Sequence, residues 1–589
     1  MNHPVRSVKW CHTIACLFVA LLVMLLYPGN ATAVNGTAFR EQLQEYLSVV
    51  AGGERIKGLS AVLVGAGDEP WFFNLGYADL EQEVPADKHT VYPIASLTKM
   101  FTAIAVMQLV EEGMLELNDP VVSHLPEFSI KSRFTGGVDI TVKHLLSHYA
   151  GLPRDLYKGL MTEVPSERPD LLDYLSGQYA AFPPGHKYVY SNLSYELLGL
   201  MLESLSGQQF EDFLFQRVLL PLDMQASGFY ADVNDHTGPA QAYVQALDVA
   251  FEEMPSMLRA AGGLYSSASD MALLLQWIME RGKHPPYVSE WLFNKMFADQ
   301  KTEDALDVGF ESGWSWVLEH YHYEDDERAT FAYQIGSTLH YNAVMAVAPD
   351  EGLGIVILCN TGGVIDVMTE MARMIILSAI EETTGKSLHA PHTPTLIPEA
   401  EFTEADALNV QGHYILQNEV ISINYQEGAV IFTSGGQSFR ALFHEDGWFS
   451  LGDDLRFNVV AWEETKVLII SRFGRTFPAG TDVSGKYLLP GDIFSYLGSY
   501  TLYGVNDQWE EVMYRQADLL LEEGLLQLRL WLSSHQQTIF GYQVAHFNLI
   551  PKSGSEAVIA GFGMYKGETV FWGSDEKGPY VRFSGLEFR

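Results

Sequence analysis

The spacing of apolar residues changes near residue 400, and this change limits the possible fold more than any other feature of the chain. From about residue 37 to residue 385 the sequence mixes helical and strand patterns, whereas from about Glu401 onward short alternating runs are separated by turn residues. Alternation with a period of two is typical of antiparallel strands that have one buried face. The sequence therefore predicts an α+β domain over residues 37–385, a linker over 386–400 and an all-β region beyond it.

The all-β region contains an internal resemblance. Leu497-Gly498-Ser499-Tyr500 in its second half echoes Gln411-Gly412-His413-Tyr414 in its first half. Short strands joined by turns, in repeated units, are typical of small barrels. We expect two small antiparallel barrels, over residues 401–480 and 490–589, that are diverged copies of one unit. One two-lobed barrel or sandwich is the alternative.

Apolar runs at both ends of the first domain predict hairpins. Residues 58–64 and 71–75 form one candidate pair, and residues 342–347 and 354–359 form another across a turn. The two ends of the domain could then meet in one sheet. Helical patterns lie between and after these hairpins, at residues 96–112, 193–206, 210–217, 268–280 and 364–382.

Residues 1–33 have the three parts of a secretory signal peptide. Arg6 and Lys9 precede an apolar run over residues 14–27, and Ala31-Thr32-Ala33 follows as a cleavage site. The run is shorter than the roughly 20 residues that a bilayer span needs. We therefore expect cleavage after Ala33 and a secreted or periplasmic chain without stable membrane insertion. An uncleaved membrane anchor is the alternative.

The net charge of the chain limits the kinds of partner that it can bind. Acidic side chains number 74 against 36 basic ones, which gives a formal net charge of −38. Such a surface repels phosphate backbones and anionic lipids, so nucleic acid is not expected as a partner. The mature chain would keep only Cys359, which we expect to be a buried apolar residue.

The clearest chemical signal is Ser96-Leu97-Thr98-Lys99 at the start of an apolar helix. Residues 100–110 are apolar nearly all round, so the helix should be buried. Burial disfavours an ammonium and lowers the pKa of Lys99, while Ser96 lies one turn away on the same face. A neutral lysine can take the serine proton and activate the hydroxyl as a nucleophile. A capping serine beside a solvent-reaching lysine is the alternative for this motif alone.

A second segment, Tyr190-Ser191-Asn192, precedes the helical pattern at residues 193–206. Tyr190 offers a phenol that can relay a proton, and Asn192 offers a carboxamide that can hold a substrate amide. Taken alone, the tripeptide is more typical of a helix entry with Asn192 as the N-cap. Together with Ser96 and Lys99 it favours a catalytic site.

These residues resemble the serine β-lactamase-related family, which includes class C β-lactamases, D-alanyl-D-alanine carboxypeptidases, D-aminopeptidases and related esterases. The family's Ser-x-x-Lys motif matches Ser96 to Lys99, and its Tyr-x-Asn motif matches Tyr190 to Asn192. Residues 140–153 and 261–267 are also similar to family segments. The resemblance covers roughly residues 37–385. It implies a β-lactamase/transpeptidase-like domain, in which helices flank an antiparallel sheet.

The resemblance also implies a reaction, which is hydrolysis through a serine acyl-enzyme at an amide or ester bond. Ser96 would attack the carbonyl, Lys99 and Tyr190 would handle its proton, and the backbone N–H groups of Ser96 and Ser337 would form the oxyanion hole. The substrate would be a D-amino-acid peptide, a β-lactam or an ester, including one derived from the cell wall. No metal or organic cofactor is implied, and the oligomeric state is not indicated.

His144 and His148 lie in the first of the additional family segments. We expect them to be structural, on a helix surface or in hydrogen bonds, because no third ligand is spaced for a metal.

The family's third motif, a Lys-Thr-Gly or His-x-Gly triplet, is replaced here by Gln334-Ile335-Gly336-Ser337. Neutral Gln334 cannot attract a substrate carboxylate as lysine does, although Gly336 still permits a close approach of substrate. His340 is a candidate for the missing cation in substrate binding. His236-Thr237-Gly238 matches the triplet by letter but comes too early in the chain. A non-catalytic binding or sensor protein with the same fold is therefore the alternative function.

Overall fold

The computed structural model describes most of the chain from residue 36 to residue 589. Its gaps are residues 133, 135–138, 157–169, 231–238, 246, 252–257, 303–305, 308–309, 324–326, 390–396, 417–418, 453–454, 463–464, 473–474, 483–494, 502–513, 523–524, 533–543, 552–554, 560–568 and 585. The predicted signal peptide and the His236-Thr237-Gly238 triplet lie outside the described residues. In the described part, none of the helices has the length and apolar character needed to span a membrane.

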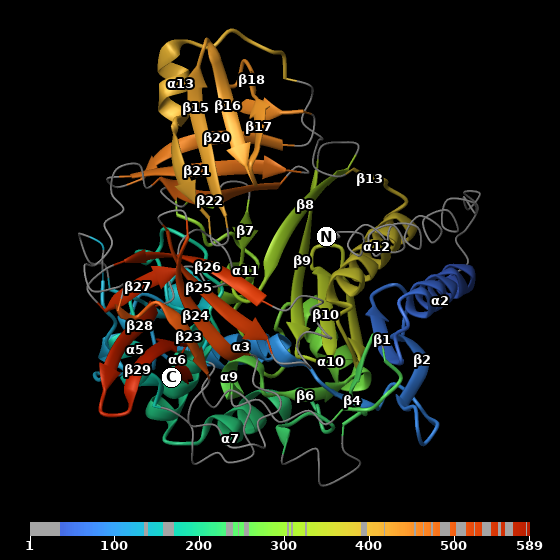
Figure 1. Cartoon of the computed structure of the whole chain (residues 1–589). Coiled ribbons are helices and arrows are strands. Elements are labelled where there is room, and N and C mark those ends of the chain that lie inside the picture. Colours follow the sequence, from blue (N-terminus) through green and yellow to red (C-terminus); the bar gives the residue numbers. More distant parts are fainter. Residues whose placement is uncertain are drawn as a thin grey trace.

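Strands from both ends of the first domain pair in one antiparallel sheet, as the sequence predicts (Figure 1). The sheet has nine strands in the order β13-β8-β9-β10-β11-β1-β2-β3, with β7 paired to β8. Both predicted hairpins are present, and β1 joins them by pairing with β11. The strands are β1 (Gly58–Val64), β2 (Trp71–Asp79), β3 (Val84–Pro85), β7 (Glu311–Ser312), β8 (Val317–Tyr323), β9 (Arg328–Ser337), β10 (Asn342–Ala348), β11 (Leu353–Cys359) and β13 (Leu388–His389).

Helices cover both faces of this sheet. On one face α2 (Gly36–Gly53) and α12 (Ile365–Thr384) form a core with alternate residues of the central strands, and on the other α10 (Ala268–Met279) and α3 (Thr98–Glu111) do so. Every residue of β1, β10 and β11 is therefore buried, Cys359 included. Coverage on both sides explains why these strands are mostly apolar on both faces rather than alternating.

The remaining elements of the first domain surround α3. The predicted helix at residues 96–112 is split, because its first turn is a 3-10 turn, η1, before α3 begins. The predicted helix at residues 210–217 is also split, since a π-helical turn follows Leu214. These elements are η1 (Ala95–Leu97), η2 (Val121–Ser123), α4 (Val142–Leu146), α5 (Leu171–Gly177), α6 (Asn192–Ser206), α7 (Phe210–Leu214), η4 (Phe215–Leu219), α9 (Arg259–Gly262) and α11 (Glu290–Met296), with the strand pairs β4 (Val91–Pro93) with β6 (Tyr265–Ser267) and β5 (Tyr243–Val244) with β12 (Thr361–Gly362).

The C-terminal region is rich in strands and forms two separate sheets. It is not wholly β, because α13 (Glu404–Val410) precedes the first strand, held by a capping box between Thr403 and Asp406. The first sheet contains β14 (Gly412–Ile415), β15 (Val420–Gln426), β16 (Ala429–Ser434), β17 (Gln437–Arg440), β18 (Leu442–Phe443), β19 (Phe449–Leu451), β20 (Leu455–Trp462), β21 (Thr465–Arg472) and β22 (Arg475–Asp482). Its two edge strands, β17 and β18, follow one another in the chain.

The second C-terminal sheet is a nearly closed eight-stranded barrel. Its first and last strands meet through two hydrogen bonds of 2.8 Å, which Thr501 and Arg589 exchange between their backbone N–H and C=O groups. The strands are β23 (Gly498–Thr501), β24 (Tyr514–Glu522), β25 (Leu525–Leu532), β26 (Val544–Pro551), β27 (Glu556–Ile559), β28 (Thr569–Asp575), β29 (Gly578–Phe583) and β30 (Leu586–Phe588).

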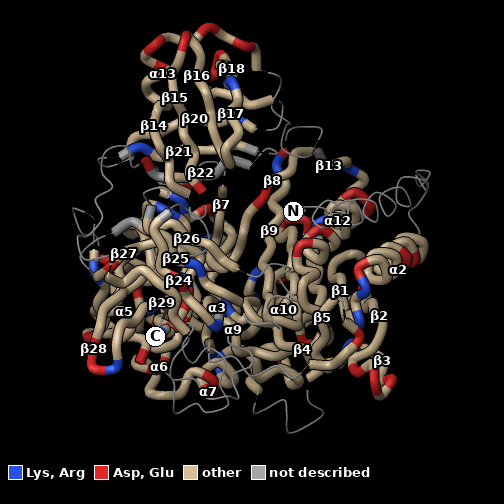
Figure 2. The backbone as a smooth tube through the Cα atoms, viewed as in Figure 1, with Lys and Arg blue, Asp and Glu red and all other residues tan. Residues whose placement is uncertain are grey.

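The echo between the two halves of this region has a structural counterpart. Tyr414 donates a hydrogen bond to the carbonyl oxygen of Val410 (2.8 Å), and Tyr500 donates one to that of Tyr496 (2.6 Å). The same bond, four residues back along the chain, thus fixes the entry to each sheet. Acidic residues occur in all parts of the molecule and are not gathered in one place (Figure 2). This distribution fits solvated surface charge.

Candidate active site

Ser96 lies on the 3-10 turn η1, at the bend between β4 and α3. The preceding residue, Ala95, has a φ of 46°, in the left-handed region that non-glycine residues seldom adopt. Ala95 and Leu97 are buried, whereas Ser96 is partly exposed. The strained bend thus turns the serine side chain outward from an otherwise buried segment.

Lys99 is fully buried at the start of α3, as the sequence predicts. Its Nζ atom donates to Oγ of Ser96 (3.2 Å), to Oδ1 of Asn192 (2.7 Å) and to the carbonyl oxygen of Ala261 (2.7 Å). Burial lowers the pKa of Lys99 from its usual range, and the nearby Tyr190 and Asp155 oppose this shift. The amine is therefore well placed beside the serine and is more readily neutral than an exposed lysine.

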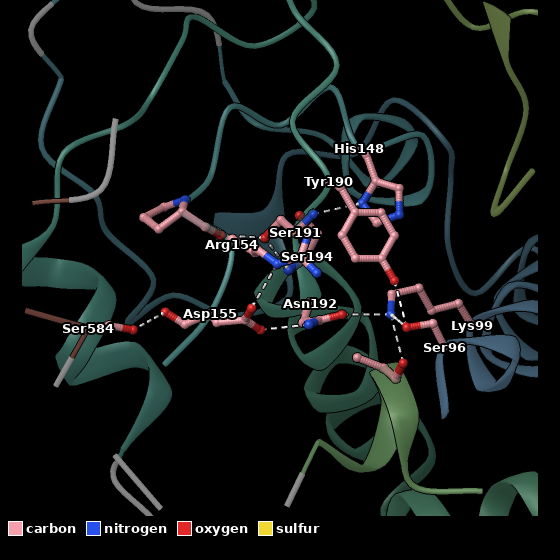
Figure 3. A network of polar contacts seen from close by, with 12 residues as sticks. Ser96, Lys99, His148, Arg154, Asp155, Tyr190, Ser191, Asn192, Ser194 and Ser584 are labelled. Carbon is pink, nitrogen blue, oxygen red and sulfur yellow. Dashed lines mark hydrogen bonds and ion pairs between the residues drawn. The ribbon is translucent and has the colours of Figure 1, made fainter. Parts of the chain in front are cut away.

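Tyr190 brings a third functional group to the same atom. Its hydroxyl donates to Oγ of Ser96 at 2.7 Å, and its ring centroid lies 4.8 Å from Nζ of Lys99 (Figure 3). The guanidinium of Arg154 lies 4.8 Å from the ring centroid, and the ring of His148 lies at 4.6 Å. The structure therefore brings Ser96, Lys99 and Tyr190 together, although 94 positions separate the tyrosine from the serine.

Asn192 connects Lys99 to a buried carboxylate. Its Oδ1 accepts from Lys99, and its Nδ2 donates to Oδ1 of Asp155 at 2.6 Å. The alternative interpretation of Asn192 as the N-cap of α6 is wrong, because Ser191 caps this helix by accepting from the N–H of Ser194 (3.2 Å). The carboxamide of Asn192 is thus available for side-chain contacts.

His148 is buried against Tyr190 and is hydrogen-bonded, as expected for a structural residue. Its Nδ1 accepts from the N–H of Ser191 (3.2 Å), so the neutral ring carries its proton on Nε2. Burial lowers the pKa of His148 well below its usual value, and the positive charges of Lys99 and Arg154 lower it further. The ring therefore adds no charge beside Tyr190.

His144 also has a structural position. Its Nδ1 accepts from the N–H of Thr141 (3.2 Å) in a capping box at the start of α4. Burial lowers the pKa of His144 to about 4. Within the described ranges, no three His, Cys, Asp or Glu side chains gather as a metal site.

Strand β9 passes directly beside η1 at Gly336. A Cβ atom at this position would lie 2.2 Å from the carbonyl oxygen of Ile94 and 3.3 Å from the backbone nitrogen of Ser96. Only glycine permits such an approach of two backbones. The next residue, Ser337, is exposed, and its hydroxyl donates to the carbonyl oxygen of Thr338 and to Oδ1 of Asn342, both at 3.1 Å.

Comparison with known proteins places this arrangement in a family. Residues 39–379 match the family model described as Beta-lactamase. The chain belongs to the Beta-lactamase family. Its first domain accordingly has the fold of the serine hydrolases among the β-lactamases and penicillin-binding proteins.

Individual relatives match smaller parts. The chain is 34% identical over 176 residues to Protein flp of Staphylococcus aureus (strain MW2). This aligned region covers 30% of this chain and 35% of Flp. It is 24% identical over 345 residues to the Beta-lactamase of Escherichia coli (strain K12), which covers 52% of this chain and 85% of that protein. The similarity to Flp thus spans about a third of the length of Flp.

The solved structure of SurE is similar in fold. The crystal structure of SurE superposes with a TM-score of 0.54 and 21% identity, over 75% of this chain and 99% of SurE. The octameric penicillin-binding protein homologue from Pyrococcus abyssi gives a TM-score of 0.48 and 23% identity, over 74% and 99% of the two chains.

Strand β9 carries Gln334 where the sequence resemblance leads us to expect the cation of the triplet. Gln334 is buried, and its Oε1 accepts from the N–H of Ile335 (3.2 Å). His340, in the turn between β9 and β10, is also fully buried and stacks on Phe251 with ring centroids 5.0 Å apart. The ring of His340 is thus engaged with the protein, and its role in substrate binding stays a prediction.

Sequence reasoning missed two residues of the site. Asp155 is 4% exposed and accepts from both Asn192 and Nε of Arg154 (3.0 Å). The two missed residues, Arg154 and Asp155, directly follow the family-like segment at residues 140–153. Their position after Pro153 was the only signal that the sequence offered. Their importance depends on contacts with α6, which a local pattern does not contain.

Proposed function

We propose that this chain is an exported serine hydrolase that forms an acyl-enzyme on Ser96 and acts on amide or ester bonds. One feature supports this most directly. Oγ of Ser96 accepts hydrogen bonds from both a buried amine, Lys99, and a phenol, Tyr190. A serine hydroxyl needs an adjacent base to become a nucleophile, and two groups able to move protons lie within contact of it.

The contacts of Lys99 favour it as the base. The Ala261 carbonyl can only accept, and Asn192 must present its oxygen because the carboxylate of Asp155 engages its Nδ2. Two N–H bonds of Lys99 are therefore held by these acceptors. In the neutral amine the remaining position, a lone pair, is directed at Ser96 and can receive its proton.

The proposed reaction has two stages. Oγ of Ser96 bonds to the substrate carbonyl carbon, its proton passes to Lys99, and Tyr190 relays a proton to the leaving nitrogen or oxygen. The backbone N–H groups of Ser96 and Ser337 hold the tetrahedral oxyanion. Water then cleaves the acyl-enzyme and regenerates Ser96. No metal or organic cofactor takes part in this scheme.

The substrate class we propose is a D-amino-acid peptide, a β-lactam or an ester, small enough to reach a partly exposed serine. One solved SurE structure is described as containing D-Leu. Neutral Gln334 in place of a lysine weakens recognition of a substrate carboxylate, so amides and esters without one are favoured. Cell-wall fragments would fit a chain that is secreted or periplasmic after signal cleavage.

We also propose that both C-terminal sheets are barrels, with units at residues 401–480 and 490–589. The direct succession of edge strands β17 and β18 supports closure of the first sheet, and the shared tyrosine bond supports a common origin. Residues 386–400 would then be the linker from the catalytic domain at residues 37–385.

Labelling of the nucleophile tests the proposed function. Treatment with a fluorophosphonate is expected to add one adduct, on Ser96, because this partly exposed hydroxyl lies beside the buried amine of Lys99. Intact-mass measurement followed by peptide mapping would locate it. Ser96→Ala should take no label, whereas Ser574→Ala, on the exposed β28–β29 hairpin, should label like the wild type. An adduct elsewhere in wild type would contradict the assignment of Ser96.

The labelling rate should also depend on pH. Because neutral Lys99 is the proposed base, the rate is expected to fall as the pH decreases and the amine becomes protonated. Burial lowers the pKa of Lys99, so the midpoint should lie below the usual lysine value of 10.5. Rates measured across the stable pH range would establish it. A midpoint at or above the ordinary value would argue against a buried lysine base.

The alternative function is a binding or sensor protein that has the same fold but no turnover. We consider it because neutral Gln334 stands where the family motif has a cation. A folded wild-type protein that takes neither a fluorophosphonate nor a fluorescent penicillin on Ser96 would favour this alternative.

A further inference from the structure

The C-terminal barrel β23–β30 touches the catalytic domain close to Ser96. Ser584 of the barrel donates a hydrogen bond of 2.9 Å to the carbonyl oxygen of Asp155, which lies 429 positions earlier in the chain. Figure 3 shows this contact at one end of a chain of hydrogen bonds that continues through Asn192 to Lys99 and Ser96. The barrel therefore reaches the network that surrounds the candidate nucleophile.

Three further contacts, made by Lys131 and Tyr179, fix the barrel on the same part of the domain. Lys131 pairs with Glu556 of β27 at 3.1 Å, and the N–H of Tyr179 donates to Oγ1 of Thr569 on β28 at 3.0 Å. The ammonium of Lys131 also lies 5.6 Å from the ring centroid of Phe571. Strands β27 and β28 and the turn that carries Ser584 thus all contact the domain in the region of Asp155.

Ser584 is built into this interface rather than placed on its edge. It is 2% exposed and has a φ of 49°, a left-handed conformation that is uncommon for serine. This backbone occurs in the turn between β29 and β30, where it brings the hydroxyl to the Asp155 carbonyl. A buried strained residue with a specific polar contact is typical of a functional constraint.

Asp155 has different partners for its backbone and its side chain. Its carbonyl oxygen faces the barrel, while its carboxylate accepts from Nδ2 of Asn192 and from Nε of Arg154. A carboxylate cannot donate, so Asn192 must turn its nitrogen to Asp155 and its oxygen to Lys99. Without that carboxylate, the amide of Asn192 could reverse and present an N–H to the amine.

We propose that Asp155 is a positioning residue, which sets the amide of Asn192 and thereby the direction of the Lys99 lone pair, and that the C-terminal barrel holds Asp155 in place through Ser584. This inference rests on the proposed function of Ser96 and Lys99. It makes the barrel part of the scaffold of the active site.

A reversed amide would change what Lys99 does. Its neutral amine would accept from Asn192 and turn an N–H toward Ser96, so the lone pair would no longer face the serine proton. Reversal of the Asn192 amide is therefore expected to lower the rate of acylation of Ser96 and to have a smaller effect on the stability of the fold. Among the described residues, the charged or titratable groups close to Lys99 are Tyr190, Tyr195, His148, Arg154, Asp155 and Glu196, the last of which accepts from the N–H of Ala261.

The test compares full-length variants by their rate of fluorophosphonate labelling as a function of pH. Asp155→Asn should slow labelling by about 100-fold, since small displacements of a catalytic group have effects of that order. The pH at which the labelling rate falls on the acid side should also decrease in this variant, because the lost negative charge no longer raises the pKa of Lys99. Ser584→Ala should slow labelling by about 3- to 10-fold, which corresponds to one hydrogen bond, with this pH unchanged.

Ser574→Ala is the matched control, with the same substitution in the same barrel at an exposed position near the end of β28. Equal rates for Ser584→Ala, Ser574→Ala and wild type would overturn the role of the barrel, and an unchanged rate and pH profile in Asp155→Asn would overturn that of Asp155. If Asp155→Asn does not fold, Ser584→Ala carries the test by itself. Absence of label on wild-type Ser96 would instead contradict the proposed function.

Discussion

Replacing Lys99 with methionine is expected to slow the acylation of Ser96 by about 10²- to 10⁴-fold, the range typical of a lost general base. Methionine has a similar length and no polar hydrogen, so it fills the space without acting as a base. The variant also leaves Oδ1 of Asn192 and the Ala261 carbonyl without their donor. Each unsatisfied buried group costs about 1–3 kcal/mol, so stability to urea should fall as well.

The rate and the stability can be separated by experiment. Labelling of Lys99→Met would be measured at urea concentrations well below the midpoint of its unfolding. Only folded protein is then compared with the wild type. Lys295→Met, at an exposed position on α11, is the matched control and should leave both quantities unchanged. Labelling of Lys99→Met at the wild-type rate would show that another group takes the serine proton.

Local patterns were sufficient to predict much of the fold. Residues 58–64, apart from Ser60, and residues 354–359 are apolar and bounded by turns, and they lie in the adjacent strands β1 and β11. Burial of Lys99 followed from the apolar residues on every side of its helix, and the structure has it fully buried. In each case the determining information lies within one short segment, where periodicity reports burial directly.

Features that depend on distant contacts could not be predicted. Asp155 matters because Asn192 and Ser584 meet it, and neither contact has a local signature. The positive φ of Ala95, at the bend before α3, is likewise not suggested by the residue type. The helix α13 did have a local signal, the capping box of Thr403 and Asp406, but the strand patterns around it directed attention elsewhere.

The role of Gly336 was predicted only in part. The sequence suggested that this glycine admits substrate, whereas in the structure it admits the backbone of η1. The absent Cβ faces the Ile94 carbonyl at 2.2 Å, and real Cβ atoms do not come that close to a backbone oxygen. Since η1 carries Ser96 and β9 carries Ser337, Gly336 sets the spacing between the two proposed oxyanion donors.

Gly336→Ala should therefore disturb the site strongly for a single added methyl group. Relief of the clash requires β9 or η1 to move by a substantial part of an ångström, and displacements of that size cost about 100-fold in rate. Overpacking should also lower the stability by about 1–3 kcal/mol. Fluorophosphonate labelling and urea unfolding would measure the two effects. Gly498→Ala on β23, where an added Cβ meets no atom within 4 Å, should change neither appreciably. Wild-type labelling in Gly336→Ala would show that Ser96 and Ser337 do not need this close spacing.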